Sequence, residues 1–122
     1  MLCLALLLAA PALVSPALAQ EGGAVFENRC ASCHAVAPDA PPMAGPNLDG
    51  VVGRRVGSAP GFDYSPVLEQ AGRDGDAWDA ERLLGFLADP EGMYPGVWMG
   101  ANGLHDEAER RAVVDWLQRF AP

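Results

Sequence analysis

The sequence is organised around Cys30-Ala31-Ser32-Cys33-His34, two cysteines separated by two residues with a histidine directly after the second. On a helical turn this spacing places two sulfur atoms side by side and directs an imidazole past them. Covalent haem attachment needs these groups: two thioether bonds to the porphyrin edge and one nitrogen bound to the iron. C-x-x-C-H is the signature of that attachment. The stretch therefore predicts a chain folded around one haem.

Two other interpretations of the cysteine pair are weaker. A redox disulfide of the thioredoxin kind needs a βαβ pattern around it, and the sequence shows none. A structural zinc site needs four ligands at set spacings. Outside the motif the chain has only Cys3 and His105 to offer, and Cys3 lies in an apolar leader.

The first part of the chain has the pattern of an export signal. Residues 2–14 are apolar, but the run is shorter than the roughly 20 residues that span a bilayer. Ala17-Leu18-Ala19 is a small-x-small cleavage pattern, which predicts a signal peptide over 1–19 and a mature domain over 20–122. The usual positive residues before the apolar run are missing, so a leader retained as a membrane anchor stays an alternative.

The charge balance narrows the choice of partners. Residues 20–122 carry eight arginines, no lysine and sixteen acids, so the formal charge is 8 − 16 = −8. Nucleic-acid binding needs a basic face, which this composition does not provide. An acidic protein instead favours a redox partner with a basic docking face. At 122 residues without a repeat, one domain is expected.

The pattern predicts an all-α domain of four or five helices with long loops wrapped around one haem. Asp89-Pro90 ends one helix, since the residue before a proline disfavours helical geometry. Ser65 and Pro66 are typical of a helix start, and Gly72 of its end. The predicted helices are 21–34, 64–72, 76–88 and 106–120, and the predicted loops are 35–61 and 90–104.

Three further features bear on how the chain would fold and hold the haem. Val113, Trp116, Leu117 and Phe120 form one apolar face of the last helix, and we expect Val113 and Trp116 to cover the glycines at 22 and 23. The loop over 90–104 carries Met93 and Met99, and a Met/His pair is a known axial set that raises the reduction potential. The Pro46 carbonyl is a candidate acceptor for the second ring N–H of His34.

In the order of these motifs the chain resembles the class I cytochrome c family, of the mitochondrial-like and proteobacterial soluble kind, from about Gly22 to Leu117. The matching residues are Gly22, Phe26, Cys30-Ala31-Ser32-Cys33-His34, Gly45-Pro46-Asn47-Leu48, Gly53-Arg54, Gly61-Phe62-Asp63-Tyr64-Ser65, Trp78, Asp89-Pro90, Pro95-Gly96-Val97-Trp98-Met99 and Trp116.

The resemblance implies the small cytochrome c fold, with the N- and C-terminal helices packed together. It also implies that Cys30 and Cys33 bind haem c covalently, that His34 is the proximal iron ligand, and that Met99 rather than Met93 is the distal one. The Pro46 carbonyl would orient His34. The family's haem propionates would be hydrogen-bonded or neutralised here by four residues: Arg54, Tyr64, Ser65 and Trp78.

The chain departs from the family pattern around the distal ligand. Leu68 and Val97 stand where relatives often place a polar side chain, and Phe86 stands where a tyrosine often contacts the distal sulfur. With fewer donors there, we expect a more easily displaced Met99 and a shifted reduction potential. The lysines that ring the haem edge in mitochondrial relatives are also missing.

The resemblance implies a periplasmic one-electron carrier that is a monomer and not an enzyme. It would shuttle electrons between donor and acceptor complexes of a respiratory or photosynthetic chain. A quinol–cytochrome c reductase or a dehydrogenase would be the donor, and an oxidase or a reaction centre the acceptor. Two alternatives remain. One is a dedicated or membrane-tethered electron-transfer subunit of one enzyme. The other is a haem peroxidase or ligand-binding protein, which needs an open sixth position on the iron.

Overall fold

The structure, a computed structural model, describes residue 10 and residues 16–122, with side chains from residue 21 onward. It contains α1 (Pro16–Arg29), α2 (Pro66–Arg73), α3 (Ala80–Ala88), α4 (Pro90–Met93), α5 (Glu107–Leu117) and a closing 3-10 turn, Gln118–Phe120. The part described has no strand beyond a single antiparallel bridge between Arg55 and Ala77. The predicted all-α fold with long loops is confirmed.

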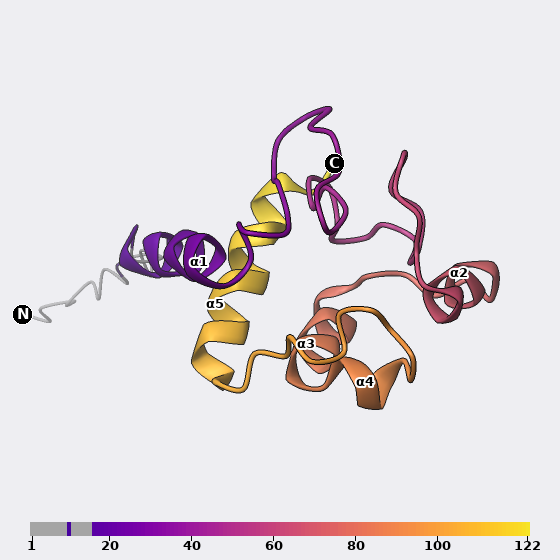
Figure 1. Cartoon of the computed structure of the whole chain (residues 1–122). Helices are drawn as coiled ribbons and strands as arrows, with labels where there is room; N and C mark the ends of the chain where they lie inside the picture. Colours follow the sequence, from indigo (N-terminus) through magenta and orange to yellow (C-terminus); the bar gives the residue numbers. More distant parts are fainter. Residues whose placement is uncertain (1–9, 11–15) are drawn as a thin grey trace, which may run out of the picture.

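The two terminal helices cross and pack together, as Figure 1 shows for α1 and α5. At the crossing, the backbone of Gly22 lies directly against the Ala112 carbonyl and the Trp116 side chain, so that even a methyl group would overlap them. Trp116 also stacks at a tilt on Phe26, with ring centroids 5.0 Å apart. The predicted pairing of the chain ends is confirmed, with Trp116 and Ala112 rather than Val113 meeting the glycines.

The first helix differs from its predicted bounds at both ends. It begins at Pro16, inside the predicted signal segment, and ends at Arg29. Residues 30–33 continue as turns, in which the His34 amide donates to the Cys30 carbonyl at 2.9 Å. Residues 1–9 and 11–15, with Cys3 and most of the predicted signal peptide, lie outside the described residues.

The third helix begins four residues later than predicted because Asp79 caps it. The Asp79 side chain accepts from the Arg82 amide at 2.7 Å. The residues before it are extended and pair with the segment 53–56, where Val56 donates to the Asp76 carbonyl at 2.9 Å and Trp78 to the Arg54 carbonyl at 2.8 Å. These long-range bonds hold 76–78 out of the helix.

Two smaller expectations were also wrong. The predicted loop over 90–104 contains the short helix α4, which starts because the Asp89 side chain accepts from the Gly92 amide at 2.9 Å. Ser65 occupies the cap position of α2, but its hydroxyl makes no capping bond, and the helix ends at Arg73 rather than at Gly72.

The helices enclose one apolar core. α3 packs against α5 and α4. In the part of the chain that the structure describes, fifteen hydrophobic residues are buried, among them Phe26, Leu83, Phe86, Val113 and Leu117. No helix in the described part of the chain has the length and apolar character needed to cross a membrane.

The close contact between the terminal helices predicts different effects for two neighbouring glycines. Gly22→Ala should lower the free energy of unfolding by about 1–3 kcal/mol, because the added methyl overlaps backbone and forces α1 away from α5. Gly23→Ala is the control: its methyl would meet only the Trp116 indole at 3.2 Å, and alanine favours the helix by about 1 kcal/mol. Guanidinium denaturation measures both, and equal losses would contradict the tight crossing at Gly22.

Candidate cofactor site

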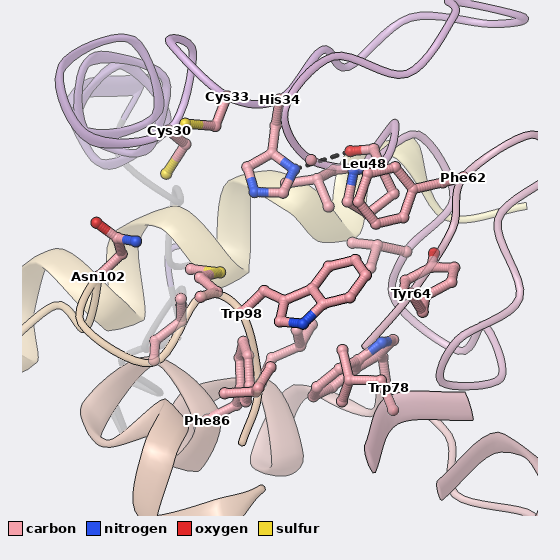
Figure 2. Close-up of a pocket in the computed structure, with 18 of the residues that line it drawn as sticks. Cys30, Cys33, His34, Leu48, Phe62, Tyr64, Trp78, Phe86, Trp98 and Asn102 are labelled. Atoms are coloured by element: carbon pink, nitrogen blue, oxygen red, sulfur yellow. Dashed lines mark hydrogen bonds between the residues drawn. The ribbon is translucent and has the colours of Figure 1, made fainter. Parts of the chain in front are cut away.

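One pocket collects residues from every part of the predicted site. It opens between the turn after α1, the loop over 44–65, the inner faces of α3 and α5, and the loop over 97–102 (Figure 2). Its lining is mostly apolar. The lining residues are Cys30, Cys33, His34, Ala44, Gly45, Pro46, Leu48, Val51, Arg54, Phe62, Tyr64, Ser65, Leu68, Trp78, Leu83, Phe86, Leu87, Val97, Trp98, Met99, Asn102, Val113 and Leu117.

The His34 imidazole is held in one orientation. Its Nδ1 lies 2.8 Å from the Pro46 carbonyl oxygen, so Nδ1–H donates and Nε2 keeps its lone pair (Figure 2). The ring lies so close to Gly45 that a side chain there would overlap it. Burial lowers the pKa of His34, with Arg54 adding to the effect and the Pro46 bond opposing it. The ring is therefore neutral, which is the form that ligates a metal.

The two cysteines lie beside the imidazole at the edge of the pocket (Figure 2). Cys30 is half-buried and Cys33 exposed, and both thiols are free. Burial, and secondarily the neighbouring Cys33, raises the pKa of Cys30 to about 11. A redox-active pair of the thioredoxin kind depends on a lowered thiol pKa. The environment of Cys30 is therefore unlike that of a catalytic disulfide.

The structure distinguishes Met99 from Met93, which the sequence placed in the same predicted loop. Met99 lines the pocket that His34 also lines. Met93, at the end of α4, is not part of the pocket wall, and its methyl group lies against Gly85 of α3. Met43 is 49% exposed and also lies outside the pocket. Of the three methionines in the described residues, Met99 alone shares the cavity with the imidazole.

The four predicted propionate contacts come together on one side of the pocket, where Arg54, Tyr64, Ser65 and Trp78 all form its wall. Ser65 is 2% exposed and its hydroxyl has no hydrogen-bond partner. The Arg54 Nη1 donates to the carbonyls of Asn47 and Asp49 at 3.0 and 3.2 Å, while its buried Nε has no partner. Such orphaned donors beside a partly desolvated cation suit a ligand with anionic oxygen atoms.

The pocket therefore fits a haem. It offers two thiols at the edge, a neutral imidazole, a thioether, an apolar wall for the macrocycle, and unpaired donors for its carboxylates. The three departures, Leu68, Phe86 and Val97, also line the pocket, and none of their side chains can donate a hydrogen bond.

Sequence reasoning assigned no contact to Phe62, Trp98 and Asn102, which line the pocket as well (Figure 2). Phe62 and Trp98 lie within sequence motifs that match the cytochrome c family, and this match could have indicated that they line the site. Asn102 lies in a glycine-rich loop and carries no such signal. These features together indicate the class of protein, a small all-α protein whose pocket suits a haem.

The comparisons with known proteins agree with that class. The family model "Cytochrome c" matches residues 19–120, so the chain belongs to the cytochrome c family, whose members bind covalent haem c and transport electrons. Cytochrome c-550 of Ancylobacter novellus is 41% identical over 100 residues, covering 82% of this chain and 92% of the relative. Cytochrome c2 iso-2 of Rhodospirillum centenum is 39% identical, covering 84% and 94%.

A solved structure supports the fold independently. The structure of cytochrome c2 from Rhodospirillum centenum matches with a TM-score of 0.78 at 37% identity, and covers 85% of this chain and 98% of its own. The predicted small cytochrome c fold is confirmed.

The contact between Gly45 and the imidazole predicts a specific defect. In the haem-loaded protein, Gly45→Ala should push the His34 ring off its position, weaken its bond to iron, and increase the high-spin fraction in the ferric absorption spectrum. Gly61→Ala is the control, because Gly61 has a φ of +75° but open space around it, so alanine there costs backbone strain alone. An unchanged spectrum in Gly45→Ala would contradict the contact.

Proposed function

We propose that this protein is a periplasmic one-electron carrier with haem c joined to Cys30 and Cys33 and with His34 and Met99 as the axial ligands of the iron. The observation that carries the proposal is the placement of the two ligand side chains. The His34 imidazole and Met99 line one apolar pocket, whereas Met93 packs outside it.

The bound haem supplies an iron that gains or loses one electron. The chain's own residues set the conditions for that exchange. The Pro46 carbonyl makes the imidazole a stronger donor to iron by accepting a hydrogen bond from its Nδ1–H. The apolar wall, including Leu68 and Phe86, limits solvent access and so raises the energy of the more positive ferric state. Arg54 opposes the charge of the propionates, which would otherwise be costly to bury.

Export and processing are part of the proposal. The signal peptide over 1–19 would be removed before Gln20, and the family match starts at residue 19. Helix α1 begins at Pro16, so cleavage would shorten it by one turn and leave the packing of Gly22 on α5 intact. If the leader were retained, the protein would be a membrane-tethered or dedicated subunit of one enzyme, which mass spectrometry of the natural N-terminus distinguishes.

The charge supports the choice of partners. With a net charge of −8 and no lysine, a monomer of this chain would dock on a basic face of a donor such as a quinol–cytochrome c reductase or dehydrogenase. The acceptor would be an oxidase or a reaction centre. Nucleic acid is not a partner. Two ligands on the iron leave no open position for substrate, so the protein would not act as a peroxidase or other haem enzyme.

A matched pair of substitutions tests the ligation. Met99→Ala should abolish the absorption band of the ferric iron–thioether bond, allow the reduced protein to bind carbon monoxide, and lower the reduction potential by on the order of 100 mV. Met93→Ala should keep the band and the potential, and lose about 2 kcal/mol of stability through the gap left beside Gly85.

Absorption spectroscopy, carbon monoxide titration and potentiometry measure these changes. If the native reduced protein already binds carbon monoxide, or if Met93→Ala removes the band, the proposed ligation is wrong.

A further inference from the structure

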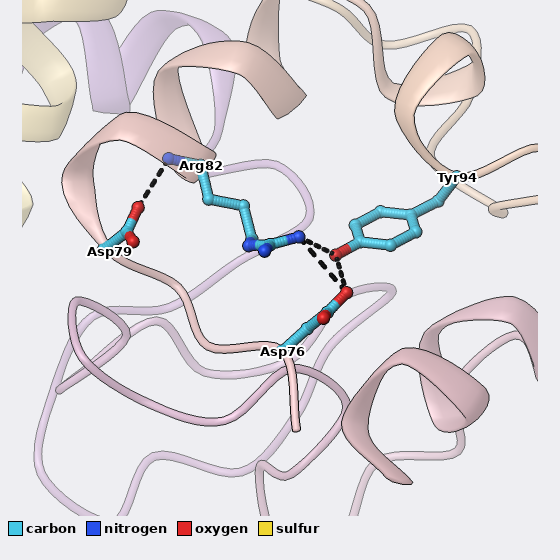
Figure 3. A network of polar contacts seen from close by, with 4 residues as sticks. All are labelled: Asp76, Asp79, Arg82 and Tyr94. Atoms are coloured by element: carbon cyan, nitrogen blue, oxygen red, sulfur yellow. Dashed lines mark hydrogen bonds and ion pairs between the residues drawn. The ribbon is translucent and has the colours of Figure 1, made fainter. Parts of the chain in front are cut away.

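Three side chains outside the pocket form a closed polar triangle (Figure 3). The Tyr94 hydroxyl donates to Asp76 Oδ2 at 2.8 Å and accepts from Arg82 Nη1 at 2.8 Å. The same Arg82 nitrogen lies 3.2 Å from that Asp76 oxygen. Tyr94 is 7% exposed, whereas both charged side chains are about one-third exposed. None of the three lines the pocket.

Two corners of this triangle are fixed to the scaffold. Asp76 donates its amide to the Ala71 carbonyl of α2 at 3.0 Å, and its carbonyl accepts from Val56 at 2.9 Å. Arg82 lies in the first turn of α3, where its amide is bonded to the capping Asp79. The Asp76 carboxylate and the Arg82 guanidinium therefore lie on segments that other hydrogen bonds already hold in place.

The third corner belongs to the loop that carries Met99. Tyr94 directly follows α4, and successive turns lead from it to Met99: Val97 donates to the Tyr94 carbonyl at 3.0 Å, and Gly100 to the Val97 carbonyl at 3.1 Å. A further bond joins Asn102 to the Met99 carbonyl at 2.9 Å. Because the loop is a chain of tight turns, fixing Tyr94 restricts where Met99 can lie.

We propose that Tyr94, held by Asp76 and Arg82, is a positioning residue that latches the methionine loop over 94–103 closed and so sets how readily an external ligand displaces Met99. The inference rests on the proposed Met99 ligation. Leu68 and Phe86, which line the pocket, and Val97 of the loop carry no side-chain donors, so none of the three can hold Met99 by a hydrogen bond. The latch outside the pocket compensates for donors missing inside it.

The ring of Tyr94 also packs against other aromatic rings, and this packing must be separated from the hydrogen bonds of its hydroxyl group. It lies edge-on to Trp78 and tilted to Phe86, with centroids 6.1 Å away in each case. Phenylalanine would preserve both contacts. Tyr94→Phe therefore removes the hydroxyl alone, and its effect reports the hydrogen bonds rather than the packing.

The test measures imidazole binding to the ferric, haem-loaded protein, in which imidazole occupies the iron only when Met99 has left. The apparent affinity then scales with the open fraction. Tyr94→Phe should tighten imidazole binding about tenfold, equivalent to about 1.4 kcal/mol, since a hydrogen bond to a charged group is lost on opening. Asp76→Asn should tighten it in the same direction, and the double variant should add little to either single one.

Val114→Ala is the matched control. Val114 is 1% exposed on α5 and is not part of the pocket wall, so the substitution should lower the denaturant midpoint without changing a residue of the pocket or of the polar triangle. It should leave imidazole affinity unchanged. If Tyr94→Phe also leaves it unchanged while the native protein shows the iron–thioether band, the latch is refuted and the ligation stands. A native protein without that band overturns both.

Discussion

The rest of the site depends on the contact between the His34 ring and the chain twelve residues further on. The Pro46 carbonyl, 2.8 Å from Nδ1, fixes the tautomer, and Gly45 leaves the ring just enough room. Burial keeps the imidazole neutral and its other nitrogen available to a metal. In the proposed carrier, a macrocycle joined to Cys30 and Cys33 would lie against this fixed side, and the remaining elements need only close the opposite side of the pocket.

The side of the pocket opposite His34 is closed by contacts between residues that are far apart in the sequence. α1 and α5 cross and pack together, while α3 packs against α5 and contributes Leu83 and Phe86 to the pocket lining. The methionine loop ends against α3, where Leu104, the next residue, donates to the Leu87 carbonyl at 2.6 Å. The proposed electron carrier thus combines a rigid histidine side with a methionine side that depends on loop contacts, including those of Tyr94.

The sequence was most informative where chemistry depends on local spacing. The C-x-x-C-H motif and the apolar face of the last helix sufficed for the haem, the all-α class and the helix pairing. The choice of Met99 over Met93 needed the resemblance, because both lie in one glycine- and proline-rich loop. Where long-range bonds compete with local propensity, the sequence misled. Residues 76–78 pair with residues 53–56 instead of starting α3. The Ser65 hydroxyl does not cap α2 and has no hydrogen-bond partner. The Asp76–Tyr94–Arg82 triangle joins residues up to 18 positions apart and has no sequence signature.

In the proposed carrier, one haem lies between His34 and Met99. The most direct measurement is an NMR spectrum of the reduced, haem-loaded protein with its methionine methyl groups labelled with ¹³C. A thioether bound to the iron holds its methyl group over the face of the porphyrin, whose ring current moves the resonance far upfield. The account predicts one methionine methyl resonance at such a position, with those of Met43 and Met93 in the ordinary range. A spectrum in which every methionine methyl group resonates in the ordinary range would contradict it.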